Sequence, residues 1–145
     1  MKTLTYLITH RMKDARVLAD KRRFLAAVYI AGYAVELALK YRICLHLQFE
    51  YGFPETKAEL VSELTNVNRS AEIRFSVTLP ELKSHNFEGL SEISMVNIIL
   101  ENTVPKEWKL VNTWVPAIRY QKKRFTEKQA AIFLKAAERI IQLMQ

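Results

Sequence analysis

The sequence predicts an all-α protein, an up-and-down bundle of roughly four to five helices that forms one domain over residues 1–145. Three observations indicate this class. The 145 residues suit a single hydrophobic core. With only three glycines and four prolines, the chain has few residues that interrupt a helix. Apolar side chains also recur at helical spacing near both ends of the chain.

Two long helices are expected in the first third of the chain. The first covers about residues 4–18, and a polar turn at residues 20–23 follows it. The second covers about residues 22–49 and is apolar on most sides, which places it in the middle of a bundle or at a dimer interface. Small residues on one of its faces would let another helix approach closely; they are Ala27, Ala31, Ala34 and Ala38.

The remaining elements are expected to be shorter, except the last. Gly52 and Pro54 end the second helix, and a capping box at residues 56–59 starts a helix that runs to about residue 64. Residues 72–79 alternate in polarity and are expected to be extended. A helix over about residues 87–101 and a short helix with Pro105 in its first turn come next. Pro116 opens a basic connection, and a capping box at residues 126–129 starts the last helix.

The charge of the chain favours an anionic partner. The net charge is +7 and the isoelectric point is about 9.6, which suits nucleic acid, nucleotides or an acidic protein, although solubility alone would also account for it. The single cysteine, Cys44, fits a reducing compartment and a small core residue. No signal-peptide pattern is present, and the apolar run 24–39 is shorter than a span of roughly 20 residues. We therefore expect a cytoplasmic protein without a membrane segment.

The sequence shows no motif of a metal site or of a phosphate loop. The three histidines, His10, His46 and His85, lie in separate segments without ligand spacing, so neither a metal nor a cofactor is expected. A basic stretch before the last helix is the stronger feature, because basic residues beside aromatic ones bind phosphates and stack on bases. The alternative is a solvated turn whose aromatic residues belong to the core. The stretch contains Trp114, Arg119, Tyr120, Lys122, Lys123 and Arg124.

Two charges in the middle of the second helix need an explanation. Glu36 precedes Lys40 by four residues, on the face opposite the alanines, together with Tyr29, Gly32 and Tyr33. An exposed pair of this kind contributes only about 0.3 to 0.5 kcal/mol. If the face is buried, the carboxylate needs a stronger partner. We expect an ion pair between Glu36 and Arg119, because arginine offers a two-pronged donor, with Lys40 alone as the fallback.

Three segments resemble HEPN domains (higher eukaryotes and prokaryotes nucleotide-binding). "FLAAVYIAGYAVELALKYRI" resembles the alanine-rich central helix of the family, of the form A-G-Y-A-x-E-x-A-L-K. "ELKSHNFEGL" is similar to its K-x-H-x-L-x-x-L segment, with Phe87 where Leu is common. "WVPAIRY" is similar to its W-x-x-x-x-R-Y segment before the last helix. The resemblance runs from about Asp14 to the C-terminal helix.

The resemblance implies a helical bundle that is commonly a homodimer. Many members act in RNA metabolism, defence or toxin–antitoxin systems, and some form a complex with a small nucleotidyltransferase. A catalytic subset consists of metal-independent ribonucleases with an Arg and a His separated by about four to six residues. This chain departs from that pattern: only three residues separate Arg42 from His46, and no His follows Arg119 at the required distance. The nuclease residues are therefore not carried over.

Three functional hypotheses follow. The first is a non-catalytic, HEPN-like homodimer that binds a nucleotide, RNA or a nucleotidyltransferase partner, in a toxin–antitoxin or defence system. Its binding residues would be Lys40, Arg119, Tyr120, Lys122, Lys123 and Arg124. The second is a divergent, metal-independent endoribonuclease toxin, with His46 or His85 as general base and Arg42 or Arg119 stabilising the phosphate. The third is a subunit that stabilises a partner, whose basic surface meets an acidic protein.

Overall fold

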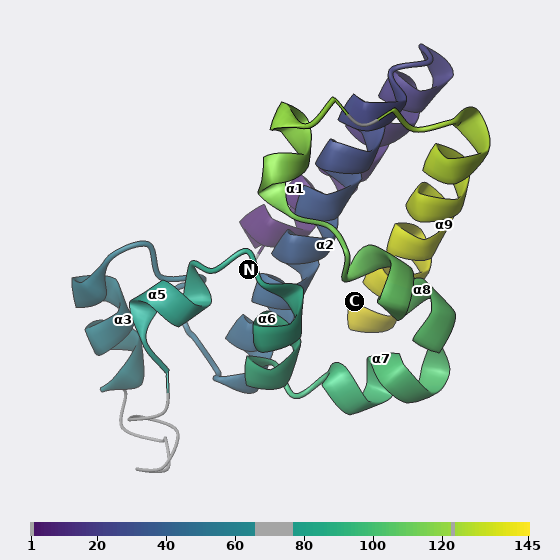
Figure 1. Cartoon of the computed structure of the whole chain (residues 1–145). Helices are drawn as coiled ribbons and strands as arrows, with labels where there is room; N and C mark the ends of the chain where they lie inside the picture. Colours follow the sequence, from purple (N-terminus) through teal and green to yellow (C-terminus); the bar gives the residue numbers. More distant parts are fainter. Residues whose placement is uncertain (1, 66–76, 123) are drawn as a thin grey trace.

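The structure is all-helical in the residues that it describes. Figure 1 shows this computed structural model, which describes residues 2–65, 77–122 and 124–145. Eight α-helices and one 3-10 helix occur in these ranges, and no strand. The all-α prediction is therefore confirmed, whereas the expected number of four to five helices is too low for the described residues. The helices are α1 (Lys2–Asp20), α2 (Phe24–His46), α3 (Lys57–Leu64), α5 (Leu79–Leu82), α6 (Phe87–Ile93), α7 (Asn97–Thr103), α8 (Pro105–Val111), η1 (Pro116–Tyr120) and α9 (Glu127–Met144).

The three long helices α1, α2 and α9 form the core, with α2 in the centre. α1 packs along α2 more extensively than any other helix does, and α9 covers a further side of α2 (Figure 1). The alanine stripe is completely buried inside the chain itself, which selects the bundle interior over the dimer interface for this face. Its four members, Ala27, Ala31, Ala34 and Ala38, are each 0% exposed.

Helix α2 resembles a membrane span in its length and composition. Among the described residues it is the one helix that is long and apolar enough to cross a bilayer, and half of its most apolar window is buried in the structure. The helix extends beyond the apolar run at residues 24–39 that the sequence suggested. Its packing against α1, α9 and α6 gives the apolar surface a place within the fold.

After α1 and after α2, a residue other than glycine adopts the left-handed backbone conformation. The predicted polar turn at residues 20–23 is confirmed, with Arg22 in the left-handed region at a φ of 58°. α2 ends at His46, earlier than the expected residue 49, because Gln48 adopts a φ of 53° and the Phe49 N–H donates to the Cys44 carbonyl. Gly52, which the sequence suggested as the stop, lies further along the chain.

One expected helix is divided in two. The predicted helix over residues 87–101 becomes α6 and α7, because Met95 takes a φ of 58° and the Val96 N–H turns back to the Ser91 carbonyl. The hydroxyl of the buried Ser94 donates to the Leu90 carbonyl and thereby satisfies the end of α6. Most of the segment expected to be extended, residues 72–79, lies outside the described residues; Leu79 already begins α5.

The predicted starts of three other helices are found. Thr126 and Gln129 form the expected capping box at the start of α9, and Pro105 occupies the first turn of α8. Thr56 caps α3, but the Glu59 carboxylate accepts from the Glu55 N–H and not from that of Thr56. The connection opened by Pro116 is the 3-10 helix η1.

The indole of Trp114 attaches the second half of the chain to α2. The ring lies directly on Gly32, stacks on Phe87 with ring centres 5.1 Å apart, and meets the Tyr33 ring edge-on at 5.1 Å. Trp114 is 2% exposed. Glycine is required at position 32 because a β-carbon there would occupy the space of the indole.

Replacing Gly32 by alanine should destabilise the fold. The new β-carbon would overlap the Trp114 ring and push the indole away from α2, so we expect a loss of about 2 to 3 kcal/mol in the free energy of unfolding. Gly89→Ala is the matched control, since its β-carbon would lie 3.6 Å from the Asn86 side chain, and it should gain about 0.5 to 1 kcal/mol. Urea unfolding followed by circular dichroism measures both; equal effects of the two variants would contradict this packing.

Candidate functional site

A stripe of polar side chains runs along one face of α2. Tyr29, Tyr33, Glu36 and Lys40 follow one another at intervals of three and four residues, so they share a face of the helix. This is the face that the sequence placed opposite the alanines. α6 and η1 pack against α2, and residues from both regions contact the polar stripe.

The carboxylate of Glu36 is buried and fully engaged. Its side chain is only 4% exposed; Oε1 accepts from Lys40 Nζ at 2.8 Å and Oε2 lies 2.7 Å from His85 Nδ1. A buried carboxylate without partners would be strongly destabilising, and here each oxygen has one. Lys40 is itself largely buried and lies over the Phe53 ring. The charges of the predicted helix therefore form the centre of a polar cluster.

The expected ion pair between Glu36 and Arg119 is wrong. His85, which precedes α6, reaches the carboxylate, while Arg119 Nη1 donates to the Tyr29 hydroxyl at 2.9 Å. Tyr29 lies about two helical turns before Glu36, so η1 meets the stripe at its other end. The fallback, Lys40 alone, is also incomplete, because His85 adds a second partner from a distant segment.

The two tyrosines connect the ends of the stripe. The Tyr29 hydroxyl donates to that of Tyr33 at 3.3 Å, and the two rings meet edge-on. Burial, followed by the hydrogen bond from Tyr29, raises the pKa of Tyr33 to about 12. Tyr33 therefore stays neutral at physiological pH. The ring also contacts His85 edge-on, which brings the polar cluster and the tyrosine pair into one continuous surface.

His85 combines an anchored ring with an accessible edge. Its Nδ1 is held by Glu36, its side chain is 49% exposed, and Nε2 makes no hydrogen bond within the described ranges. A histidine oriented by a carboxylate in this way can accept or donate a proton at the other ring nitrogen. Among the four catalytic candidates that the sequence offers, Arg42, His46, His85 and Arg119, this geometry favours His85.

The other three catalytic candidates do not join this cluster. Arg42 and His46 lie in the last part of α2 and form no hydrogen bond or ion pair with Glu36 or His85 in the part of the chain that is described. Arg119 reaches the stripe only through Tyr29. Cys44 is buried, and burial raises the pKa of its thiol to about 12, so it is a core residue as expected.

The basic stretch after η1 lies on the surface. Tyr120 is 76% exposed, and the Arg119 guanidinium lies 4.6 Å from the centre of its ring. The neighbouring Ile118 is buried and anchors η1 in the core. Lys122 and Arg124 are exposed, whereas Lys123 lies outside the described residues. Trp114 is buried, so it offers no surface for stacking a base.

Sequence reasoning missed the partner of Glu36. His85 lies 49 residues away in sequence, and no periodicity connects the two positions. The only available signal was that both belong to segments that resemble the same family. Among the described residues, no group of three or more His, Cys, Asp or Glu side chains is placed to hold a metal ion.

Comparison with known proteins adds no relative: no protein-family model, no curated protein and no solved structure matches this chain.

Removing the Glu36 carboxylate should leave Lys40 buried without its partner. We expect Glu36→Ala to reduce the free energy of unfolding by about 3 kcal/mol, the lower end of the range for breaking a buried pair, because the half-exposed His85 can turn to solvent. Glu101→Ala, an exposed position on α7, is the control and should change stability by less than about 0.5 kcal/mol. Thermal and urea unfolding measure both; a neutral Glu36→Ala variant would contradict the cluster.

Proposed function

We propose that this chain is a non-catalytic, HEPN-like binding module that acts as a homodimer and binds single-stranded RNA or a nucleotide. The observation that carries the proposal is the exposed pair of Arg119 and Tyr120. The ring of Tyr120 is open to solvent and the guanidinium of Arg119 lies over it, so the pair offers one surface for a base and one charge for a phosphate.

The charges around this pair support an anionic ligand. Lys122 and Arg124 are exposed and have no ion-pair partner among the residues whose side chains are described. The chain as a whole carries a net charge of +7. Unpaired basic side chains beside an aromatic platform bind the phosphate backbone and release counterions, so binding should weaken steeply with salt. Lys40 is no longer a candidate for ligand contact, because Glu36 engages its ammonium group.

Contacts between the three HEPN-like segments support the family assignment. Gly32 and Glu36 belong to the first segment, His85 to the second, and Trp114 to the third. The indole of Trp114 packs on Gly32, and Glu36 binds His85. Residues that resemble one family in sequence are thus the ones that contact each other in space. The assignment brings with it a bundle fold, a homodimer, a cytoplasmic location and a role in a toxin–antitoxin or defence system.

The dimer would use a surface other than the alanine stripe. The stripe is completely buried within one chain, whereas Met95, Ile98 and Ile99, at and near the start of α7, are each about half exposed or more. Exposed apolar side chains that lie together favour contact with a second protein chain. A nucleotidyltransferase is the other partner that the family resemblance suggests for such a surface.

Fluorescence anisotropy with a labelled single-stranded RNA tests the binding surface. The double variant Arg119→Ala with Tyr120→Ala should bind at least about tenfold more weakly, because it loses one stacked base and one phosphate contact. The matched control, Arg11→Ala with Tyr51→Ala, removes one arginine and one tyrosine that is 79% exposed elsewhere, and should bind like the parent protein. Affinity should fall as salt rises from 50 to about 200 mM.

Three results would contradict the proposal. They are the absence of RNA and nucleotide binding at low salt, equal weakening by both double variants, and a strict monomer by size exclusion with light scattering. Affinity purification from the native cell that recovers a nucleotidyltransferase, without any RNA affinity of the pure protein, would favour the partner-binding hypothesis.

A second candidate function is a metal-independent endoribonuclease, and one observation favours it. The imidazole of His85 is oriented by a buried carboxylate, and its Nε2 has no hydrogen-bond partner among the residues that the structure describes, which is the arrangement of a general base. Arg119 would supply charge to the phosphate from the same side of α2, through its position on Tyr29. The Arg–His spacing of the catalytic subset is still missing, so this remains the second candidate.

Incubating RNA with the pure protein in EDTA decides between the two functions. If the protein is a nuclease, His85→Ala should reduce the rate of cleavage at least about 100-fold, the contribution of a general base. His10→Ala, on α1, is the control and should cleave normally. Intact RNA after incubation with the parent protein, together with normal growth of cells that express it, would exclude the nuclease.

A further inference from the structure

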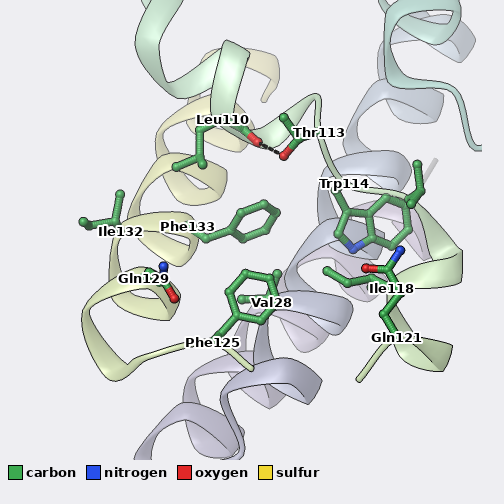
Figure 2. Close-up of a pocket in the computed structure, with 11 residues that line it drawn as sticks. Val28, Leu110, Thr113, Trp114, Ile118, Gln121, Phe125, Gln129, Ile132 and Phe133 are labelled. Atoms are coloured by element: carbon green, nitrogen blue, oxygen red, sulfur yellow. Dashed lines mark hydrogen bonds between the residues drawn. The ribbon is translucent and has the colours of Figure 1, made fainter. Parts of the chain in front are cut away.

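A cavity lies where α2, α8, η1 and α9 meet. Its volume is about 490 Å³, which falls within the range of roughly 300 to 1,000 Å³ that holds small molecules. Figure 2 shows Phe133 of α9 projecting toward Trp114 and Ile118 on the opposite wall. Phe125 and Val28 of α2 also belong to the walls. Because eight of the eleven lining residues are apolar, the space is suited to hydrocarbon.

Few polar groups of the lining are available to a ligand. The indole N–H of Trp114 is buried against Gly32 of α2 and does not open into the cavity. The Thr113 hydroxyl donates to a backbone carbonyl of α8 at 2.7 Å, and the side-chain oxygen of Gln129 accepts from a backbone N–H before α9. The exposed carboxamide of Gln121 is the main polar group that is left. A ligand that buried hydrogen-bonding groups here would lose its bonds to water without replacing them, so the walls favour a hydrocarbon.

Apolar side chains of the lining are left open to solvent. Ile132 on α9 is 49% exposed and Val115, just before η1, is 46% exposed, and both line the cavity. Covering such side chains with hydrocarbon removes apolar surface from water and is therefore favourable. The cavity thus offers both the volume for an apolar ligand and apolar surface that the fold itself leaves uncovered.

A basic hollow shares a wall with the cavity. It has a volume of about 400 Å³, and Phe125 lines both spaces. Three arginines also line the hollow, namely Arg22, Arg23 and Arg124. Arg22 forms an exposed pair with Glu127 at 3.6 Å, whereas Arg23 and Arg124 have no ion-pair partner among the residues that the structure describes. Because a guanidinium group can donate two parallel hydrogen bonds to a carboxylate, the hollow suits an acidic head group.

We propose that the cavity binds a medium-chain fatty acid, with the hydrocarbon chain between Phe125, Phe133 and Ile118 and the carboxylate at the arginines of the basic hollow. The apolar walls select the chain, and the guanidinium groups select an acid over an alcohol or an amine. Phe125 borders both spaces, so it marks where the chain joins the head group. The site is separate from the proposed RNA-binding pair of Arg119 and Tyr120, neither of which lines the cavity.

Calorimetric titration of the full chain with hexanoate, octanoate and decanoate, each below its micellar concentration, tests the ligand class. Each added methylene group should strengthen binding about fourfold, which corresponds to about 0.8 kcal/mol for one buried CH₂. 1-Octanol has the same chain as octanoate without the charge, and it should bind about threefold more weakly. Octylamine places a positive charge at the arginines and should bind at least about tenfold more weakly than octanoate.

Two variants at exposed positions locate the ligand by the same titration. Arg124→Gln should weaken the binding of octanoate about threefold and leave that of 1-octanol unchanged, whereas Lys13→Gln, which removes the same charge on α1, should change neither. Ile132→Ser should weaken the binding of both ligands about fivefold, because it removes apolar contact with the chain. Its matched control is Ile98→Ser on α7, where the isoleucine is 62% exposed and distant from the lining, and this variant should bind like the parent protein.

The outcomes separate this inference from the proposed function. Affinity that does not rise with chain length, or octylamine that binds as tightly as octanoate, overturns the fatty-acid site even if RNA binds at Arg119 and Tyr120. Equal weakening by Ile132→Ser and Ile98→Ser indicates adsorption elsewhere on the surface and also overturns it, as does displacement of octanoate by AMP. Octanoate binding that depends on Ile132 and persists in the variant Arg119→Ala with Tyr120→Ala supports the site even if RNA does not bind.

Discussion

The contact of the Trp114 indole with Gly32 is the constraint on which the rest of the structure depends. Glycine in the middle of a helix lowers its stability by about 1 kcal/mol, and here the missing side chain makes room for a large aromatic ring on the most buried helix. The burial of that ring more than offsets the loss. Through Phe87 and Tyr33, the same indole also fixes α6 and the polar stripe, so one packing event positions segments from both halves of the chain.

Buried carboxylates determine how the loops attach to this core. Glu36 on α2 holds His85, and Glu63 on α3 accepts the backbone N–H groups of Glu50 and Tyr51, which fastens the loop that follows α2. A buried charge tolerates few arrangements, because any conformation that leaves it unpaired costs several kcal/mol. These two residues therefore favour one placement of each loop over many others that apolar packing alone would allow.

η1 and the residue that follows it contribute to two different surfaces. Arg119 and Tyr120 are exposed near the tyrosines of α2, whereas Ile118 and Gln121 line the cavity. Both surfaces depend on Trp114, which lies two residues before η1 and forms part of the cavity wall. A change at the indole should therefore affect both, while changes at Tyr120 or Gln121 affect one each.

The sequence by itself determined the elements whose signals are local. The long helices α1, α2 and α9, the caps at Thr56 and Thr126, the alanine stripe and the polar face of α2 all follow from periodicity and short-range chemistry. The division of the helix at Met95 was not predictable, because a left-handed φ at a methionine has no composition signal and is imposed by the surrounding packing.

Only the tertiary structure decided which distant residues meet. Electrostatics required a partner for Glu36, but both His85 and Arg119 were chemically able to serve, and the choice depended on how α6 and η1 pack on α2. Packing also forms the cavity, because its walls come from α2, α8, η1 and α9 and no sequence motif indicates them. Local sequence encodes the period of a helix and the need of a charge for a partner, whereas the identity of that partner is a property of the packed chain.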